Sequence, residues 1–203
     1  MILTGGMNMK FTTKKSFVLA SSSPRRKELF GMLNIPYEIV TADVEETSVP
    51  FTNEQEYVRN VALLKTRAVA ANIKNKIIIG ADTIVAFNGQ LLHKPKSVEE
   101  AILHLQSLSG QTHEVLTAVA MIDEAGQENS FVEKTTVTFK KVSNELIQAY
   151  VETGDPFDKA GGYGIQTDGV FLVEKIEGDY NNVVGLPIAS LTEQLLTLNY
   201  ITI

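Results

Sequence analysis

The chain has 203 residues, a formal net charge of −6 and no cysteine, and 44% of its residues are hydrophobic. Length and apolar content allow one domain with a sizeable core, and the negative charge disfavours a broad duplex-binding surface, so no stable nucleic acid complex is expected. The lack of cysteine excludes disulfides and thiolate-bound metals and favours the cytoplasm, and no apolar stretch is long enough to span a membrane.

The first 16 residues are polar and contain glycine, and they lack the continuous apolar region of a signal peptide. We expect residues 1–16 to form a loose leader outside the fold, with Met7 and Met9 as alternative start sites. Residues 17–203 are expected to form a single domain, because no internal repeat, low-complexity run or linker divides them.

Hydrophobic periodicity predicts the secondary structure of this domain in chain order. Strands are expected at 17–20, 35–44, 74–87, 112–123, 130–142 and 170–178. Helices are expected at 24–33, 53–72, 97–110, 144–152 and 188–198. Asn88-Gly89 predicts a hairpin turn, and residues 158–169 and 179–187 are expected to be loops. Because βα units alternate with hairpins, the order favours α/β or α+β with a mixed sheet over a purely parallel fold.

The segment "SSSPRR" at residues 21–26 places two cations where a helix disfavours them. Ser23 has the character of an N-cap and Pro24 of a first helical residue, so two arginines lie in the first turn. The helix dipole disfavours positive charge there by about 0.3–1 kcal/mol per charge. Backbone N–H groups and the guanidinium groups of Arg25 and Arg26 together favour an anion site, with phosphate as the anion. The alternative is a solvated basic turn.

Lys65 is expected near the middle of an apolar helix face. At 3.6 residues per turn, this face carries Tyr57, Val58, Val61, Ala62, Ala68 and Val69. An unpaired lysine is seldom fully buried. We therefore infer that the face borders a cleft into which Lys65 points. The alternative is that its side chain extends past the helix edge into solvent.

Asp82 interrupts the apolar run "IIIGADTIVAF" at residues 77–87. A carboxylate in such a run must be paired, hydrogen-bonded, metal-bound or protonated. Glu45 and Glu46 follow an earlier strand and are candidate companions, and two carboxylates beside a phosphate-binding loop suit Mg²⁺. The alternative is a structural aspartate bonded to nearby backbone donors.

The segment "DKAGGYGIQTDG" at residues 158–169 has four glycines, which favours a loop that closely approaches a ligand or another strand. Its spacing is neither a dinucleotide fingerprint nor a P-loop. Lys159 enters this loop and Lys94 follows the hairpin, and each taken separately fits a surface lysine. The three histidines lack metal-site spacing, and a nucleophile among Ser21–Ser23 has no evident base.

Seven segments between Leu19 and Ile188 carry a family resemblance. They are "LASSSPRRKELF", "VEE", "GADTIV", "HKP", "LSGQTHEVLTAV", "DKAGGYGIQ" and "GDYNNVVGLPI". In this order they resemble the Maf family of nucleoside triphosphate pyrophosphatases, also called septum-formation inhibitors. The resemblance implies a mixed-sheet α/β fold with two lobes and a central cleft, similar to inosine-triphosphate pyrophosphatases, and a homodimer. It also implies hydrolysis of a nucleoside triphosphate to the monophosphate and pyrophosphate. From the two carboxylates we expect a divalent cation as cofactor, Mg²⁺ or Mn²⁺.

The same resemblance implies roles for individual residues. Asp82 takes the place of the catalytic acid or base, and Glu46 corresponds to a charged residue of the cleft. Our own hypothesis is that Glu46 and Asp82 are the metal ligands. The expected substrate-binding residues are Ser21, Arg25, Arg26, Lys65, Thr83, Lys94, Lys159 and Gln166.

Three positions resemble the subgroup that acts on dTTP and UTP, namely Arg25, Thr83 and Gln166. The subgroup that acts on 7-methyl-GTP has tryptophan, glutamine and glutamate at these positions. The amide of Gln166 can pair with the imide edge of a pyrimidine because it both donates and accepts hydrogen bonds. One departure from the family is Gly162, where close relatives often have alanine, and we expect it only to loosen the loop.

Two other functions remain open from the sequence. A nucleotide- or DNA-binding regulator of cell division would keep the cations but would not need Asp82 and Glu46, and the negative charge argues against its DNA-binding version. A sugar-nucleotide or general phosphatase would release orthophosphate in place of pyrophosphate. The expected partner is a nucleoside triphosphate, from either an ordinary or a modified pyrimidine.

Overall fold

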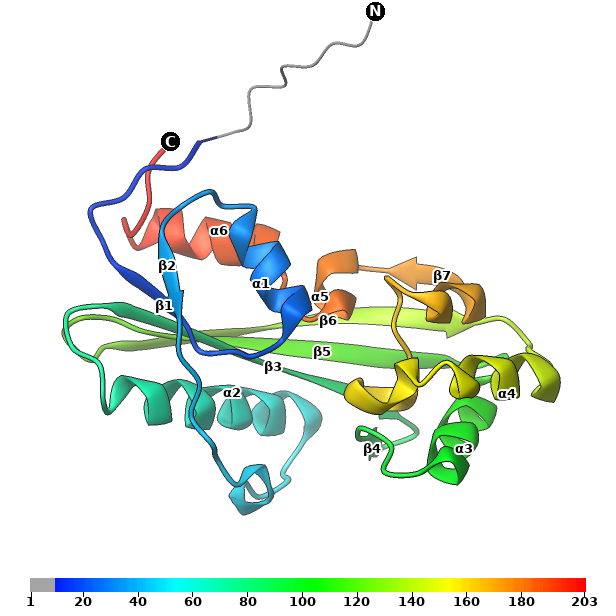
Figure 1. The fold of residues 1–203 in the computed structure, drawn as a ribbon. Coiled ribbons are helices and arrows are strands. Elements are labelled where there is room, and N and C mark those ends of the chain that lie inside the picture. The colour runs from blue at the N-terminus through cyan, green and yellow to red at the C-terminus, as the bar shows by residue number, and fades with distance from the viewer. Residues whose placement is uncertain (1–9) are drawn as a thin grey trace, which may run out of the picture.

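The computed structural model describes residues 10–203, through which one mixed β-sheet runs (Figure 1). The strand order is β2-β1-β3-β5-β6-β7, and β4 pairs with β3 beside this path. The strands are β1 (Phe17–Leu19), β2 (Tyr37–Ile39), β3 (Ile77–Phe87), β4 (Gln90–Leu92), β5 (Thr112–Ile122), β6 (Glu128–Phe139) and β7 (Val173–Glu177). β1 pairs in parallel with β2 and β3, whereas the pairs from β3 to β7 are antiparallel, so the predicted mixed-sheet α/β fold is confirmed.

Helices cover both faces of this sheet (Figure 1). They are α1 (Pro24–Gly31), α2 (Glu54–Ala70), α3 (Val98–Leu108), α4 (Asn144–Glu152), α5 (Tyr180–Val184) and α6 (Ile188–Thr197). α1 and α6 lie on one face, and α2 lies on the other against β3 and β5, while α3 and α4 pack together at the end of the sheet far from β2. Within residues 10–203, no helix is long and apolar enough to cross a membrane.

Buried apolar side chains of residues 10–203 form two large clusters, and two smaller clusters lie under α2. The largest cluster joins α1 and α6 to the sheet and includes Phe30, Ile79 and Leu191. A second cluster joins α3 and α4 to the opposite end and includes Leu105 and Phe139. Residues of both clusters line the cavity described below, as expected for a cleft between two lobes.

Two predicted strands are shorter than expected by four residues or more. The strand predicted at 35–44 is only Tyr37–Ile39, because its partner β1 offers three residues for pairing. The residues that follow leave the sheet and reach the cavity instead. The strand predicted at 170–178 begins at Val173, because residues 168–172 form a 3-10 turn.

The loop predicted at 179–187 contains α5, so this prediction was wrong for five residues. The Asp179 side chain caps this helix by accepting a hydrogen bond from the Asn181 N–H at 2.8 Å. The predicted hairpin turn is confirmed, since Asn88 and Gly89 have φ values of 50° and 73°, as a two-residue type I′ turn requires.

Part of the segment expected to be a loose leader contacts the domain. Residues 1–9 lie outside the described residues, but Thr12 pairs with Thr202 as an isolated bridge. The Thr13 hydroxyl also donates a hydrogen bond to the Tyr200 carbonyl at 2.7 Å. These contacts tie the start of the described chain to its C-terminal end.

Gly80 lets α2 lie directly on β3. A Cβ at this position would lie 2.2 Å from Thr66 Oγ1, and Thr66 is fully buried and donates to the Ala62 carbonyl at 2.7 Å. The close contact at Gly80 therefore sets the height of α2 above the sheet, and Lys65 is the residue next to Thr66.

We expect Gly80→Ala to destabilise the fold by about 1–3 kcal/mol, because α2 must move outward to relieve the overlap. Thermal or urea unfolding of the purified protein measures this change. Gly31→Ala is the matched control, since its new Cβ would lie 3.7 Å from the nearest atom, Tyr37 Oη, which is ordinary van der Waals contact. Equal stability of the two variants would contradict the assignment.

Candidate active site

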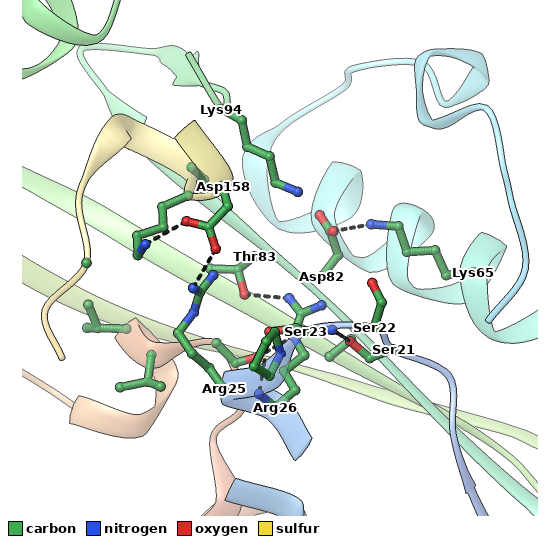
Figure 2. Close-up of a pocket in the computed structure, with 18 of the residues that line it drawn as sticks. Ser21, Ser22, Ser23, Arg25, Arg26, Lys65, Asp82, Thr83, Lys94 and Asp158 are labelled. Carbon is green, nitrogen blue, oxygen red and sulfur yellow. Dashed lines mark hydrogen bonds and ion pairs between the residues drawn. The ribbon is translucent and has the colours of Figure 1, made fainter. Parts of the chain in front are cut away.

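One cavity of about 490 Å³ opens where the β1–α1 loop, α2, β3 and the glycine-rich loop meet (Figure 2). All of the site residues predicted from the sequence line it. They are Ser21, Arg25, Arg26, Glu46, Lys65, Asp82, Thr83, Lys94, Lys159 and Gln166. The fold therefore brings together residues that lie up to 145 positions apart in the chain, from Ser21 to Gln166.

Lys65 links two carboxylates at the centre of the cavity. Its Nζ lies 2.6 Å from Asp82 Oδ1 and 2.8 Å from Glu46 Oε1. The side chain points into the cavity rather than past the helix edge into solvent (Figure 2). Glu45, the other candidate companion, accepts a hydrogen bond from the Thr47 hydroxyl at 3.1 Å and is not among the lining residues.

The environment of Asp82 favours its neutral form more than water does. Asp82 is only 8% exposed, and this burial raises the pKa of its carboxyl group. The charges of Lys65 and Arg26 act in the opposite direction, and the hydrogen bond from Lys65 adds to them. The residue is therefore a buried carboxylate whose ionisation depends on two neighbouring cations.

Arg26 is held by the protein on one side of its guanidinium group. Its Nε donates to the Gly185 carbonyl at 2.8 Å, and its Nη2 donates to Thr83 Oγ1 at 3.0 Å. Ser23 caps α1 as predicted, by accepting a hydrogen bond from the Arg26 N–H. Burial lowers the pKa of Arg26, which nearby Asp82 opposes, and a guanidinium group stays charged in proteins. Within residues 10–203, the remaining N–H groups of Arg26 have no hydrogen-bond partner, so they can meet an anion in the cavity that Arg26 lines.

Arg25 takes a different partner, which the sequence did not indicate. Its Nη1 lies 2.9 Å from Asp158 Oδ2, on the segment that enters the glycine-rich loop. The pair joins the start of α1 to the opposite wall of the cavity (Figure 2). The alternative of a freely solvated basic turn therefore does not describe Arg25 or Arg26.

Lys159 lines the cavity but is engaged within its own loop. Its Nζ donates to the Asp155 carbonyl at 2.8 Å, to Asp155 Oδ1 at 2.9 Å and to Asp158 Oδ1 at 2.6 Å. An ammonium group has three protons, so these acceptors use all of them. Phosphate binding by Lys159 stays a prediction, and it requires the exchange of one of these bonds. Lys94, by contrast, is exposed and extends toward the same space as Lys65 (Figure 2).

Apolar side chains also line the cavity. They include Val85, Val115 and Tyr163, which are nearly fully buried. The Tyr163 hydroxyl lies 2.7 Å from His113 Nε2, and burial lowers the pKa of His113 to about 4, so this histidine is neutral at pH 7. The cavity therefore combines charged groups with apolar side chains that are suited to contact with a flat apolar group.

Two carboxylates of the site, Asp82 and Glu46, are candidate ligands for a cation such as Mg²⁺. Within residues 10–203, no group of three or more His, Cys, Asp or Glu side chains could hold a metal. Asp82 and Glu46 nevertheless both reach the same nitrogen of Lys65, so they lie close together. Two hard carboxylates fit Mg²⁺ or Mn²⁺ when phosphate oxygens and water complete the coordination.

Glycine is required in the loop that carries Gln166. Gly161 and Gly162 have φ values of 73° and 75°, which an L side chain rarely adopts. The departure at Gly162 therefore suits the local backbone, rather than simply loosening the loop as expected. A Cβ at Gly164 would lie 2.5 Å from Lys159 Cε, so the loop folds tightly over that lysine.

Sequence comparison finds relatives that match nearly the whole chain. A sequence model described as "Maf-like protein" matches residues 16–198. The chain is 48% identical over 181 residues to a dTTP/UTP pyrophosphatase of Bacillus cytotoxicus, which covers 89% of this chain and 94% of the relative. It is 46% identical over 185 residues to a dTTP/UTP pyrophosphatase of Bacillus cereus, with 91% of each chain covered.

Solved structures give the fold. A HAM1 protein from Coxiella burnetii superposes with a TM-score of 0.53 at 14% identity, over 91% of this chain and 100% of that one. The Ham1 protein of Staphylococcus aureus gives a TM-score of 0.51 at 19% identity, over 89% and 100%. At this identity the likeness supports the shared architecture alone.

Proposed function

The chain belongs to the Maf family, and we propose that it is a nucleoside triphosphate pyrophosphatase that hydrolyses dTTP and UTP to the nucleoside monophosphate and pyrophosphate. The observation that carries this proposal is the buried Asp82 carboxylate, set between Lys65 and Arg26 in a cavity lined with further cations. Relatives at 46% to 48% identity that bear this activity in their names support it.

The phosphates are proposed to lie along the β1–α1 loop. Ser21 is in this loop, and Arg26 and Lys94 present donors toward the cavity without an opposing carboxylate partner among residues 10–203. The guanidinium group of Arg26 is held by two hydrogen bonds, so it needs little reorganisation when a polyanion binds. Arg25 would join Arg26 and Lys94 by exchanging Asp158 for phosphate.

Asp82 is proposed to activate the attacking water. The water oxygen attacks the α-phosphorus, the bond from this phosphorus to the bridging oxygen breaks, and pyrophosphate leaves with the electron pair of that bond. The proton of the water passes to Asp82, whose raised pKa makes it a better proton acceptor than an ordinary aspartate. Lys65 keeps the carboxylate ionised before the attack and holds it in place.

Glu46 and Asp82 are proposed to hold a divalent cation, Mg²⁺ or Mn²⁺. When bound, such an ion neutralises phosphate charge and polarises the reacting phosphoryl group. Lys65 hydrogen-bonds one oxygen of Asp82, which leaves the second oxygen of that carboxylate for another partner.

The nucleobase is proposed to lie against the apolar side chains of the cavity. Val85, Val115 and Tyr163 provide apolar contact there, and Gln166 is exposed at its edge. A primary amide can donate to one carbonyl of a pyrimidine and accept from its N3–H, which neither a carboxylate nor an aliphatic side chain can do. Ordinary and modified pyrimidine nucleotides both fit this description.

The alternative of a binding regulator of cell division is less well supported. Such a protein has no need of a carboxylate buried between two cations, and the relatives reported above are named as pyrophosphatases. The homodimer and the location in the cytoplasm stay predictions from the sequence.

A panel of nucleoside triphosphates tests the proposal. The purified chain is incubated with dTTP, UTP, dCTP, GTP and 7-methyl-GTP in the presence of Mg²⁺ or Mn²⁺, and pyrophosphate and orthophosphate are measured separately. We expect pyrophosphate as the product, and dTTP and UTP as the fastest substrates. Release of orthophosphate would indicate a phosphatase, and a faster rate with 7-methyl-GTP would contradict the roles given to Arg25, Thr83 and Gln166.

A further inference from the structure

Two threonine hydroxyl groups lead from Arg26 at the cavity into the buried part of the sheet. Thr83 Oγ1 accepts a hydrogen bond from Arg26 Nη2 at 3.0 Å and lies 2.9 Å from Thr117 Oγ1. The Thr117 hydroxyl in turn lies 2.9 Å from the backbone carbonyl of Asn182. Thr117 and Asn182 are both fully buried, and neither lines the cavity.

The direction of every hydrogen bond in this chain is fixed by chemistry. A carbonyl can only accept, so Thr117 donates its single proton to Asn182. Thr117 must then accept from Thr83, which leaves Thr83 with no proton for any other partner. An arginine can only donate, and it supplies the last bond to Thr83. The series runs in one direction, from Arg26 through two threonines to a backbone carbonyl.

Asn182 also helps to position the second hydrogen-bond acceptor of Arg26, which is the Gly185 carbonyl. The Asn182 side chain donates to the Val115 carbonyl at 3.0 Å and to Thr135 Oγ1 at 2.8 Å, which ties α5 to β5 and β6. α5 ends at Gly185, whose carbonyl accepts the Arg26 Nε hydrogen bond at 2.8 Å. α5 and its C-terminal end therefore hold two nitrogens of the Arg26 guanidinium group. The Gly185 carbonyl bonds Nε directly, and the Asn182 carbonyl reaches Nη2 through the two threonines.

We propose that Thr117 is a positioning residue of this enzyme, which acts through Thr83 to fix the Arg26 guanidinium group toward the phosphates of the nucleotide. The inference rests on the proposed function and deepens it. A buried hydroxyl in a sheet core is unfavourable unless it is fully bonded, so this network is sensitive to the loss of any member. The inference also limits the hydrogen bonds that Thr83 can make with a nucleobase. Its hydroxyl can accept a hydrogen bond from the base, but it cannot donate one.

The test compares variants that keep or remove the hydroxyl. Thr117→Val keeps the shape and removes the proton donor, Thr117→Ala removes both with little risk of overpacking, and Thr117→Ser keeps the donor. We expect kcat/KM for dTTP to fall roughly tenfold to a hundredfold in Thr117→Val and Thr117→Ala, because Thr83 and the Asn182 carbonyl each lose a partner. Thr117→Ser should recover most of the wild-type value.

Thr192→Val is the matched control, because it removes a threonine hydroxyl by the same substitution outside the network. The Thr192 hydroxyl donates to the Ile188 carbonyl at 2.7 Å within α6, and Thr192 does not line the cavity. We expect this variant to keep its kcat/KM. A loss of kcat/KM as large as in Thr117→Val would show that the loss in Thr117→Val is not specific to the network, and would overturn the proposal.

A double-mutant cycle with Arg26→Lys gives the decisive measurement. If Thr117 acts through Arg26, Thr117→Val should change kcat/KM and the affinity for the nonhydrolysable analogue α,β-imido-dUTP less than about twofold in the Arg26→Lys background. Equal effects in both backgrounds would overturn the inference. Two separate measurements distinguish failure of the proposed function from failure of the positioning role. If the wild-type chain releases no pyrophosphate, the proposed function is refuted. If Thr117→Val binds α,β-imido-dUTP as tightly as the wild type, the positioning role of Thr117 is refuted.

Discussion

Asp82→Asn is expected to bind dTTP and to release pyrophosphate about 10²–10⁴ times more slowly than the wild type, which is the contribution of a general acid–base group to the rate. Asparagine keeps the size and can still accept a hydrogen bond from Lys65, but its amide cannot take a proton from water. Rates of pyrophosphate release give kcat, and equilibrium binding of α,β-imido-dUTP measures affinity. Turnover at the wild-type rate would rule out Asp82 as the catalytic group.

Asp43→Asn is the control for this change. Asp43 also lines the cavity, but it is exposed and has no ion-pair partner among residues 10–203, so the same change of charge should leave the rate within about twofold.

The thermal stability of Asp82→Asn provides a second check. Burial raises the pKa of Asp82 in the folded protein. The contribution of this carboxyl group to the free energy of unfolding is therefore present at low pH and is lost as the pH rises through that pKa. The melting temperature of Asp82→Asn at pH 7 should therefore not fall.

Two features of the sequence were enough to locate the centre of the site. Asp82 was conspicuous because it interrupts an apolar strand, and Lys65 because it falls on an apolar helix face. Each residue alone had a structural explanation that fitted equally well. Their distance of 2.6 Å in the structure removes the ambiguity, since each charge explains the burial of the other.

The cap at the start of α1 was also predictable, because the signal is local. Ser23 and Pro24 define the helix start within two residues, and this fixes where both arginines begin. Their separate partners were not predictable. Arg25 pairs with Asp158, 133 positions away, and no local pattern marks that aspartate as different from other loop residues.

The polar network behind Arg26 was invisible for a different reason. Thr83 and Thr117 lie in strands, where threonine is common because its branched side chain suits the sheet. α5 has five residues, which is shorter than the window over which helical periodicity can be recognised. The role of the segment thus depends on tertiary contacts that adjacent residues do not encode. The family resemblance supplied expected roles for Thr83 and Arg26, and the hydrogen bonds supply the physical connection between them.

Lys65→Met should reduce kcat by roughly two orders of magnitude, as expected when a catalytic base loses the cation that positions it and keeps it ionised. Methionine has a similar length and apolar stem but no charge. Lys65 lowers the pKa of Asp82 by its charge and its hydrogen bond, and Glu46 raises it. With Lys65 removed, the pKa of Asp82 rises further and the carboxylate is protonated at pH values where the wild type keeps it ionised.

The pH dependence therefore distinguishes loss of this ion pair from general damage. The acid limb of the kcat profile should move to higher pH in Lys65→Met, so that part of the lost rate returns as the pH is raised. Arg67→Met is the matched control on the same helix, because Arg67 pairs with Glu128 at the exposed surface and such pairs contribute little. Its profile should overlay that of the wild type. A Lys65→Met enzyme that is slow but has an unshifted acid limb would show that Lys65 acts on the phosphates and not on Asp82.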